Sequence, residues 1–203
     1  MAKLLAFSGS LRKDSHNQAI VTCAAQGARA HGAEVTIIQL VDYIAPLFSE
    51  DVEAELGMPD TAQAFKQLLI EHDGVLIASP EYNSAFSAAL KNAIDWASRG
   101  AEGEAPLAAF RGKTAQLMAA SPGALGGLRG LVSLRSLLGN LGMHVHPTQQ
   151  AISKVHTLID EQGVVSDEKT IAKLHSLGKL AAASRHYLFN QFRNWLYYSS
   201  CWH

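Results

Sequence analysis

A short polar segment near the N-terminus carries the side chains that could bind a phosphate group. Between Ser8 and Asn17 it reads SGSLRKDSHN, directly after an apolar run. It lacks the G-x-x-x-x-G-K-[ST] and G-x-G-x-x-G patterns of common nucleotide loops. Its hydroxyls, amide and guanidinium precede a predicted helix start, where free N–H groups favour anions. The predicted phosphate ligands are Ser8, Ser10, Arg12, Ser15 and Asn17. The alternative is a turn in which Ser15 or Asn17 only caps the helix.

A second segment with binding potential follows a later apolar run. Pro80 stiffens a turn there, and Tyr82 adds an aromatic ring. Backbone N–H groups near Asn83 should stay unpaired until the next helix begins, so they could serve a planar heterocycle. The predicted ligand residues are Pro80, Glu81, Tyr82, Asn83 and Ser84. The alternative is that Glu81 and Asn83 only satisfy the turn.

A third segment is rich in glycine, and it reads SPGALGGLRG between Ser121 and Gly130. Residues without a Cβ allow the backbone to approach a flat ligand closely. The predicted ligand residues are Ser121, Pro122, Gly123, Gly126 and Gly127. Such a loop is weak evidence alone, but it gains weight if one fold brings all three segments together.

The elements between these segments predict an α/β fold with a doubly wound parallel sheet. Short runs that do not alternate polar with apolar residues are typical of strands buried on both faces. The runs are Leu4–Phe7, Val35–Leu40, Val75–Ala78, Ala115–Ala120 and Met143–Pro147, and stretches with helical spacing separate them. Ligands of such sheets bind beyond the carboxyl ends of the strands. The three segments follow the first, third and fourth runs, so we expect them to line one crevice.

At these residues the chain resembles the NAD(P)H-dependent FMN reductases of flavodoxin-like fold, a family that includes bacterial chromate, quinone and azobenzene reductases. The matching motifs are GSLR, PEYN with the later LKNAIDW, and SPG with GG, and the resemblance covers about residues 3–180. It implies a five-stranded sheet of order 2-1-3-4-5 between two helix layers. It also implies FMN, with its phosphate in the first segment and its isoalloxazine between the other two. One departure is Ser87-Ala88, where the family usually has Pro-Gly.

The resemblance implies hydride transfer from NAD(P)H to the flavin and then to a quinone, an azo compound, chromate or free flavin. Backbone N–H groups of the second and third segments would stabilise the charge of the reduced flavin. This chemistry needs no metal and no side-chain acid or base, so we assign none. An NADPH 2′-phosphate would favour an arginine, and the candidates are Arg99, Arg111 and Arg129. The alternative function is a flavodoxin-like electron carrier or a flavin-binding module without turnover.

Composition narrows the class of protein. The 203 residues are 48% hydrophobic and 17% charged, and the formal net charge is -1. A disordered chain and a binder of nucleic acid or anionic membrane by bulk charge are both excluded on these grounds. The chain has no apolar run long enough for a membrane span or a signal-peptide core, so we expect a cytoplasmic protein. The resemblance further implies a homodimer or homotetramer.

Several features stay outside this interpretation. The acidic stretch between Val41 and Pro59 is predicted to be a solvated loop, with a metal or acid–base site as the lesser alternative. Cys23 is predicted to be a small core residue, and His144 with His146 lacks a third metal ligand nearby. We divide the chain at residue 180, because residues 181–203 are rich in aromatic side chains. This part could be a helix packed on its own sheet, a subunit contact or a tail outside the domain.

Overall fold

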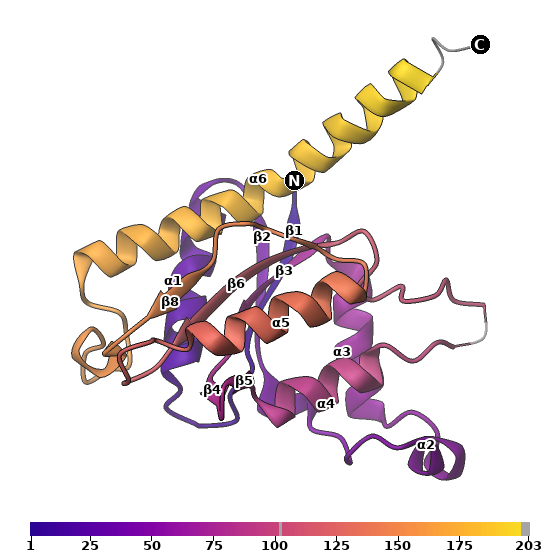
Figure 1. Cartoon of the computed structure of the whole chain (residues 1–203), viewed down its shortest axis with the longest axis horizontal. Helices are drawn as coiled ribbons and strands as arrows, with labels where there is room; N and C mark the ends of the chain where they lie inside the picture. The colour runs from indigo at the N-terminus through magenta and orange to yellow at the C-terminus, as the bar shows by residue number, and fades with distance from the viewer. Residues whose placement is uncertain (102, 200–203) are drawn as a thin grey trace.

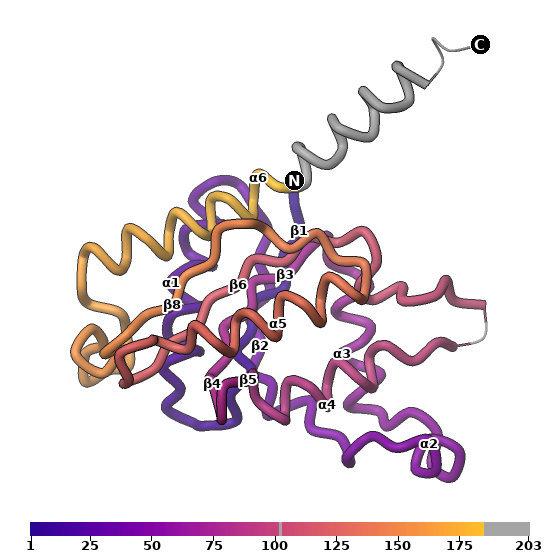
Figure 2. Tube along the Cα trace, viewed as in Figure 1, coloured from indigo at the N-terminus to yellow at the C-terminus, as the bar shows by residue number. Residues whose placement is uncertain are grey.

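The central sheet is parallel throughout (Figure 1). The structure is a computed structural model, and it describes residues 1–101 and 103–199, with side chains as far as residue 184 (Figure 2). The strand order is β2-β1-β3-β6-β7, and β8 also pairs with β6. The bounds are β1 Lys3–Ser8, β2 Glu34–Gln39, β3 Gly74–Ala78, β6 Thr114–Ala120, β7 His144–Val145 and β8 Gln150–Ile152. The predicted flavodoxin-like fold class and strand order are thereby confirmed.

Helices cover both faces of the sheet, which explains the continuous apolar strands. Every residue of β3 and of β6 is buried. Two separate hydrophobic clusters result, because alternate side chains of each strand point to opposite faces. One face packs on α1 (His16–Ala30) and α6 (Glu168–Ser199). The other packs on α3 (Asp60–Glu71), α4 (Ala88–Ala97) and α5 (Leu128–Asn140).

Two glycines allow α1 and α6 to touch backbone to backbone. A Cβ added at Gly178 would lie 2.0 Å from the carbonyl oxygen of Ala24. A Cβ added at Gly27 would lie 2.4 Å from the Cα of His175. Any side chain at either position would therefore push the helices apart.

The fifth strand is split, which differs from the single run predicted at Met143–Pro147. Its two pieces, β7 and β8, are separated by a bend over residues 146–149 that contains Pro147, which has no N–H to donate. Arg135 of α5 donates from Nη2 to the carbonyl of His146 at 2.8 Å, and from Nε to Oε1 of Gln149 at 3.1 Å. Gln116 of β6 donates to the carbonyl of Thr148 at 2.6 Å. Side chains of neighbouring elements thus replace the missing ladder bonds.

The acidic stretch is only partly a loop, so that prediction was wrong in part. It contains a 3-10 helix η1 (Leu40–Tyr43) and helix α2 (Glu50–Leu56). Ser49 caps α2 by accepting the N–H of Val52 at 3.1 Å. The carboxylates of the first turn favour the positive end of the helix, so they stabilise this helix although it buries no residue.

Helix α6 runs through residue 180 without a break, and the division of the chain there stays a prediction. The aromatic side chains beyond residue 184 lie outside the part of the chain whose side chains the structure describes. Among the helices formed by the described residues, none combines the length and apolar character that crossing a bilayer requires.

Candidate functional site

Three loops meet at the carboxyl edge of the sheet. The first loop (residues 9–15) follows β1, and the third loop (residues 121–127) follows β6. Between them lies the hairpin, which consists of β4 (Glu81–Tyr82) and β5 (Ala85–Phe86) after β3. Because β1, β3 and β6 are parallel neighbours, their following loops share one edge. The structure therefore brings the three predicted segments together.

The first loop is organised by serine hydroxyls around the start of α1. The buried Oγ of Ser8 accepts the N–H of Ser10 at 3.1 Å and lies 3.5 Å from the Oγ of Ser15. Ser15 caps α1 by accepting the N–H of Gln18 at 3.2 Å. Within the described residues, the N–H groups of His16 and Asn17 have no hydrogen-bond partner. Free N–H groups beside hydroxyls at a helix start suit a phosphate.

Asn17 has a structural partner that the sequence did not indicate. Its side-chain Oδ1 accepts the N–H of Ala120 at 2.9 Å, and its Nδ2 donates to the carbonyl of Ala120 at 3.0 Å. Asn17 thus ties the start of α1 to the end of β6, and one amide N–H remains for a ligand.

Positive groups surround this helix start. Burial lowers the pKa of His16, and the positive charges of Arg12 and His156 lower it further. Arg12 is exposed on the first loop, and His156 belongs to η2 (Val155–Thr157) after β8. His156 was not predicted, because its segment carries no binding motif. The local charge favours an anion.

The turn of the hairpin holds two non-glycine residues at positive φ. Asn83 has φ 51° and Ser84 has φ 67°, the pattern of a type I′ turn. Among the described residues, their N–H groups have no partner, and both residues are exposed. Tyr82 is 52% exposed beside them, whereas Pro80 is buried. The hairpin therefore presents free donors and an aromatic ring at the edge of the sheet.

Glu81 points to α5. Its Oε1 accepts from Nε of Arg129 at 2.9 Å, and its Oε2 accepts from the N–H of Gly130 at 3.0 Å. Burial by itself raises the pKa of the Glu81 carboxyl, but the bonds from Gly130 and Arg129 outweigh it, so the net pKa is lowered. The side chain is ionised at neutral pH and already has two protein partners.

Ser87 joins the hairpin to the first loop, a role that the sequence did not reveal. Its hydroxyl donates to the carbonyl of Gly9 and accepts the N–H of Leu90, which caps α4. Ala88 begins α4 and is not among the positive-φ residues. The chain therefore needs no glycine at this departure from the family pattern.

Two of the three glycines in the third loop are required by close packing within the protein, and the third is not. Gly126 has φ 62°, and an added Cβ would lie 2.6 Å from the backbone of Ile152. Gly127 has φ 89°, and an added Cβ would lie 2.7 Å from the Cβ of Ala119. At Gly123 an added Cβ would meet only the Oγ of Ser121, at 3.4 Å. Ser121 accepts the N–H of Gly123, and Pro122 is exposed.

The three candidate arginines lie in different environments. Arg99 forms two bonds with Glu53 of α2 and lies over the ring of Phe48. Arg111 precedes β6 and so lies at the opposite, amino edge of the sheet. Arg129 lies at the start of α5, beside the hairpin, with a side chain 59% exposed. It is the one of the three at the edge that carries the loops.

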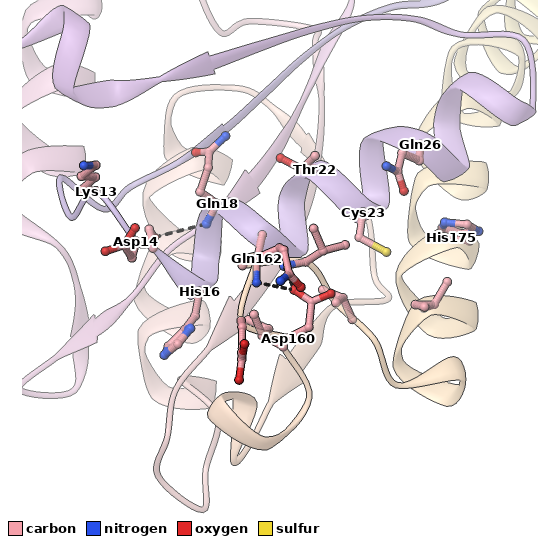
Figure 3. Close-up of a pocket in the computed structure, with 18 residues that line it drawn as sticks. Lys13, Asp14, His16, Gln18, Thr22, Cys23, Gln26, Asp160, Gln162 and His175 are labelled. Atoms are coloured by element: carbon pink, nitrogen blue, oxygen red, sulfur yellow. Dashed lines mark hydrogen bonds between the residues drawn. The ribbon is translucent and has the colours of Figure 1, made fainter.

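A groove of about 530 Å³ runs along α1 (Figure 3). Its lining comes from α1, from residues 159–165 and from α6, and it shares Lys13, Asp14 and Ser15 with the first loop. It contains no residue of the hairpin or the third loop. Cys23 faces this groove, and burial raises the pKa of its thiol to about 11, so the thiol is protonated at neutral pH.

Comparison with known proteins identifies the family. A family model described as NADPH-dependent FMN reductase matches residues 2–157. This chain belongs to the NADPH-dependent FMN reductase family. The predicted FMN, NAD(P)H and reductase activity are confirmed by this membership.

Individual relatives agree with the family. An NAD(P)H-dependent FMN reductase of Pseudomonas aeruginosa is 37% identical over 168 residues, which cover 82% of this chain and 86% of the relative. A quinone reductase of Escherichia coli K12 is 36% identical over 176 residues, which cover 86% and 89%. The flavoenzyme FerB of Paracoccus denitrificans, an NAD(P)H:(acceptor) oxidoreductase, has a TM-score of 0.72 at 26% identity, and the match covers 90% of this chain and 96% of FerB.

Proposed function

We propose that this chain passes electrons from NAD(P)H through FMN to small acceptors, with quinones as the first class to test. The relatives named quinone reductase support this choice. We propose azo compounds, chromate and free flavin as further acceptors, because the exposed hairpin residues Tyr82, Asn83 and Ser84 leave this edge of the sheet accessible to a small oxidant. The assembly we propose is a homodimer or homotetramer, which light scattering on the purified protein would measure.

The first loop would hold the FMN phosphate. The observation that carries this assignment is the pair of free N–H groups at His16 and Asn17, next to the hydroxyls of the loop. A dianion there would gain charge-assisted hydrogen bonds and the favourable helix dipole. The residues that we assign to the phosphate are Ser8, Ser10, Arg12, Ser15 and Asn17.

The hairpin and the third loop would enclose the isoalloxazine. When bound, FMN accepts hydride from the nicotinamide and passes electrons to the acceptor. The free N–H groups of Asn83 and Ser84 would stabilise negative charge on the flavin edge, and Tyr82 would exclude water. The residues that we assign to this part are Pro80, Glu81, Tyr82, Asn83, Ser84, Ser121, Pro122, Gly123, Gly126 and Gly127.

The decisive experiment removes the phosphate ligands. We expect Arg12→Ala combined with Ser15→Ala to weaken FMN binding at least about tenfold, because charged hydrogen bonds are lost. Fluorescence titration of the flavin-free protein measures this. Ser49→Ala is the control, since it removes a helix cap away from the three loops and should leave FMN affinity unchanged. Unchanged affinity in the double variant would refute the phosphate assignment.

Turnover tests the proposed path of the electrons from the nucleotide to the acceptor. We expect NADPH or NADH to bleach the flavin absorption band, and a quinone to restore it over many cycles. Arg129→Ala should raise the KM for NADPH more than that for NADH, because Arg129 is the candidate for the 2′-phosphate. A flavin band that neither nucleotide bleaches would contradict the proposed electron transfer.

A further inference from the structure

The carboxylate of Glu81 connects two elements that are far apart in the sequence. Glu81 opens the hairpin, whereas its partners Arg129 and Gly130 lie in the first turn of α5. The side chain is 10% exposed, and each of its oxygens accepts one bond, at 2.9 Å and 3.0 Å. Charge-assisted bonds in a partly buried place are stronger than those of an exposed pair.

This contact supplies what the helix itself lacks. The N-cap residue of α5 is Gly127, which has no side chain to accept an N–H of the first turn. Glu81 accepts the N–H of Gly130 in its place. The fit is close, because an added Cβ at Gly130 would lie 3.3 Å from both the Cβ of Glu81 and the carbonyl oxygen of Ala85. The hairpin is therefore seated directly on the helix start.

We propose that Glu81 is a positioning residue that locks the hairpin to α5 and thereby fixes the distance between the two loops around the flavin ring. The third loop runs straight into α5 at Gly127, so whatever holds the hairpin on this helix also sets its distance from that loop. The φ of 67° at Ser84 is unfavourable for a serine, unlike the positive φ of Asn83, and needs such support. This inference rests on the proposed function for its effect on FMN, but not for the lock itself.

The test uses Glu81→Gln, which keeps the size of the side chain and one oxygen acceptor. One oxygen of the carboxylate becomes an NH2 group in Gln, and this group is a donor. It would face another donor, either the Nε–H of Arg129 or the N–H of Gly130, so one of the two bonds is lost. In the flavin-free full chain, we expect faster hydrogen exchange at the amides of residues 81–86 and 128–131. We expect FMN binding about tenfold weaker and an altered visible circular dichroism of the bound flavin.

Glu53→Gln is the matched control. Glu53 forms a comparable two-point contact with Arg99, at 2.9 Å and 2.8 Å, between α2 and the residues after α4. Loss of this contact should accelerate amide hydrogen exchange only around α2 and residue 99. FMN affinity and the flavin spectrum should stay at the parent values.

The outcomes separate the two proposals. If Glu81→Gln leaves both exchange and FMN affinity unchanged, or if Glu53→Gln weakens FMN binding equally, the positioning role is overturned. If the parent chain does not bind FMN, the proposed function fails, and the exchange of the hairpin still decides whether Glu81 locks it. Faster hairpin exchange together with weaker FMN binding, in Glu81→Gln alone, supports the role.

Discussion

His16 reports directly on the charge of the first loop. Its imidazole is half-buried beside the positive charges of Arg12 and His156, and its pKa is lowered. A bound phosphate dianion would favour the protonated imidazole, so we expect FMN to raise the pKa of His16. NMR titration with and without FMN measures this, and His16→Gln assigns the signal. An unchanged pKa would place the phosphate away from this helix start.

Ser84 offers a test of backbone conformation in a single residue. Its φ of 67° disfavours a side chain, whereas glycine adopts such angles freely. We expect Ser84→Gly to raise the free energy of unfolding of the flavin-free protein by about 0.5–1 kcal/mol. Ser84→Ala keeps the Cβ and should give no gain. Thermal or urea unfolding compares the three proteins, and a less stable Ser84→Gly would contradict the expectation.

The residue types predicted the first loop better than the other two. Ser8, Ser10 and Ser15 lie together because their partners are local. The partners of Asn17 and Glu81 lie 103 and 48 residues away, so only the fold reveals them. The sequence predicts that Gly126 and Gly127 give access to a ligand, but the atoms that crowd them belong to the protein itself.

At the scale of elements, the strands buried on both faces were predictable because each is a continuous apolar run. The split of the fifth strand was not, because the bonds that hold its bend come from Arg135 and Gln116 in other elements. Helix α2 was missed because it buries no residue and so has no apolar stripe. Its one sequence signal is Ser49 before a run of acids, a pattern typical of helix starts.

Replacing glycine by alanine should have opposite effects at two helical positions, one inside the contact between α1 and α6 and one on an open helix surface. Gly178→Ala would bring a Cβ to 2.0 Å from the backbone of Ala24, so we expect a loss of about 2 kcal/mol or more in stability. Gly139→Ala of α5 meets nothing within 4 Å and should gain up to about 1 kcal/mol. Urea unfolding followed by circular dichroism measures both. Equal effects would contradict the tight helix contact.

At the scale of the whole molecule, ligand binding and folding are linked. FMN at about 100 times its Kd should add about 2.7 kcal/mol to the free energy of unfolding. Riboflavin lacks the phosphate, so at the same concentration we expect a much smaller rise in Tm. The Arg12→Ala and Ser15→Ala double variant should abolish most of this difference. Equal rises with both flavins would show that the phosphate contributes little to binding.

The division of the outer strand into β7 and β8 also affects how the protein would aggregate at high concentration. An unpaired strand edge can template cross-chain pairing and aggregation. On one side of the sheet, the two short pieces β7 and β8 interrupt that template at Pro147. On the opposite side, β2 is an unbroken strand of six residues, although Nη2 of Arg29 already donates to its Val35 carbonyl at 2.6 Å. Fibril growth by strand addition should therefore begin along β2, and that border is the place for a protective lysine in an engineered variant.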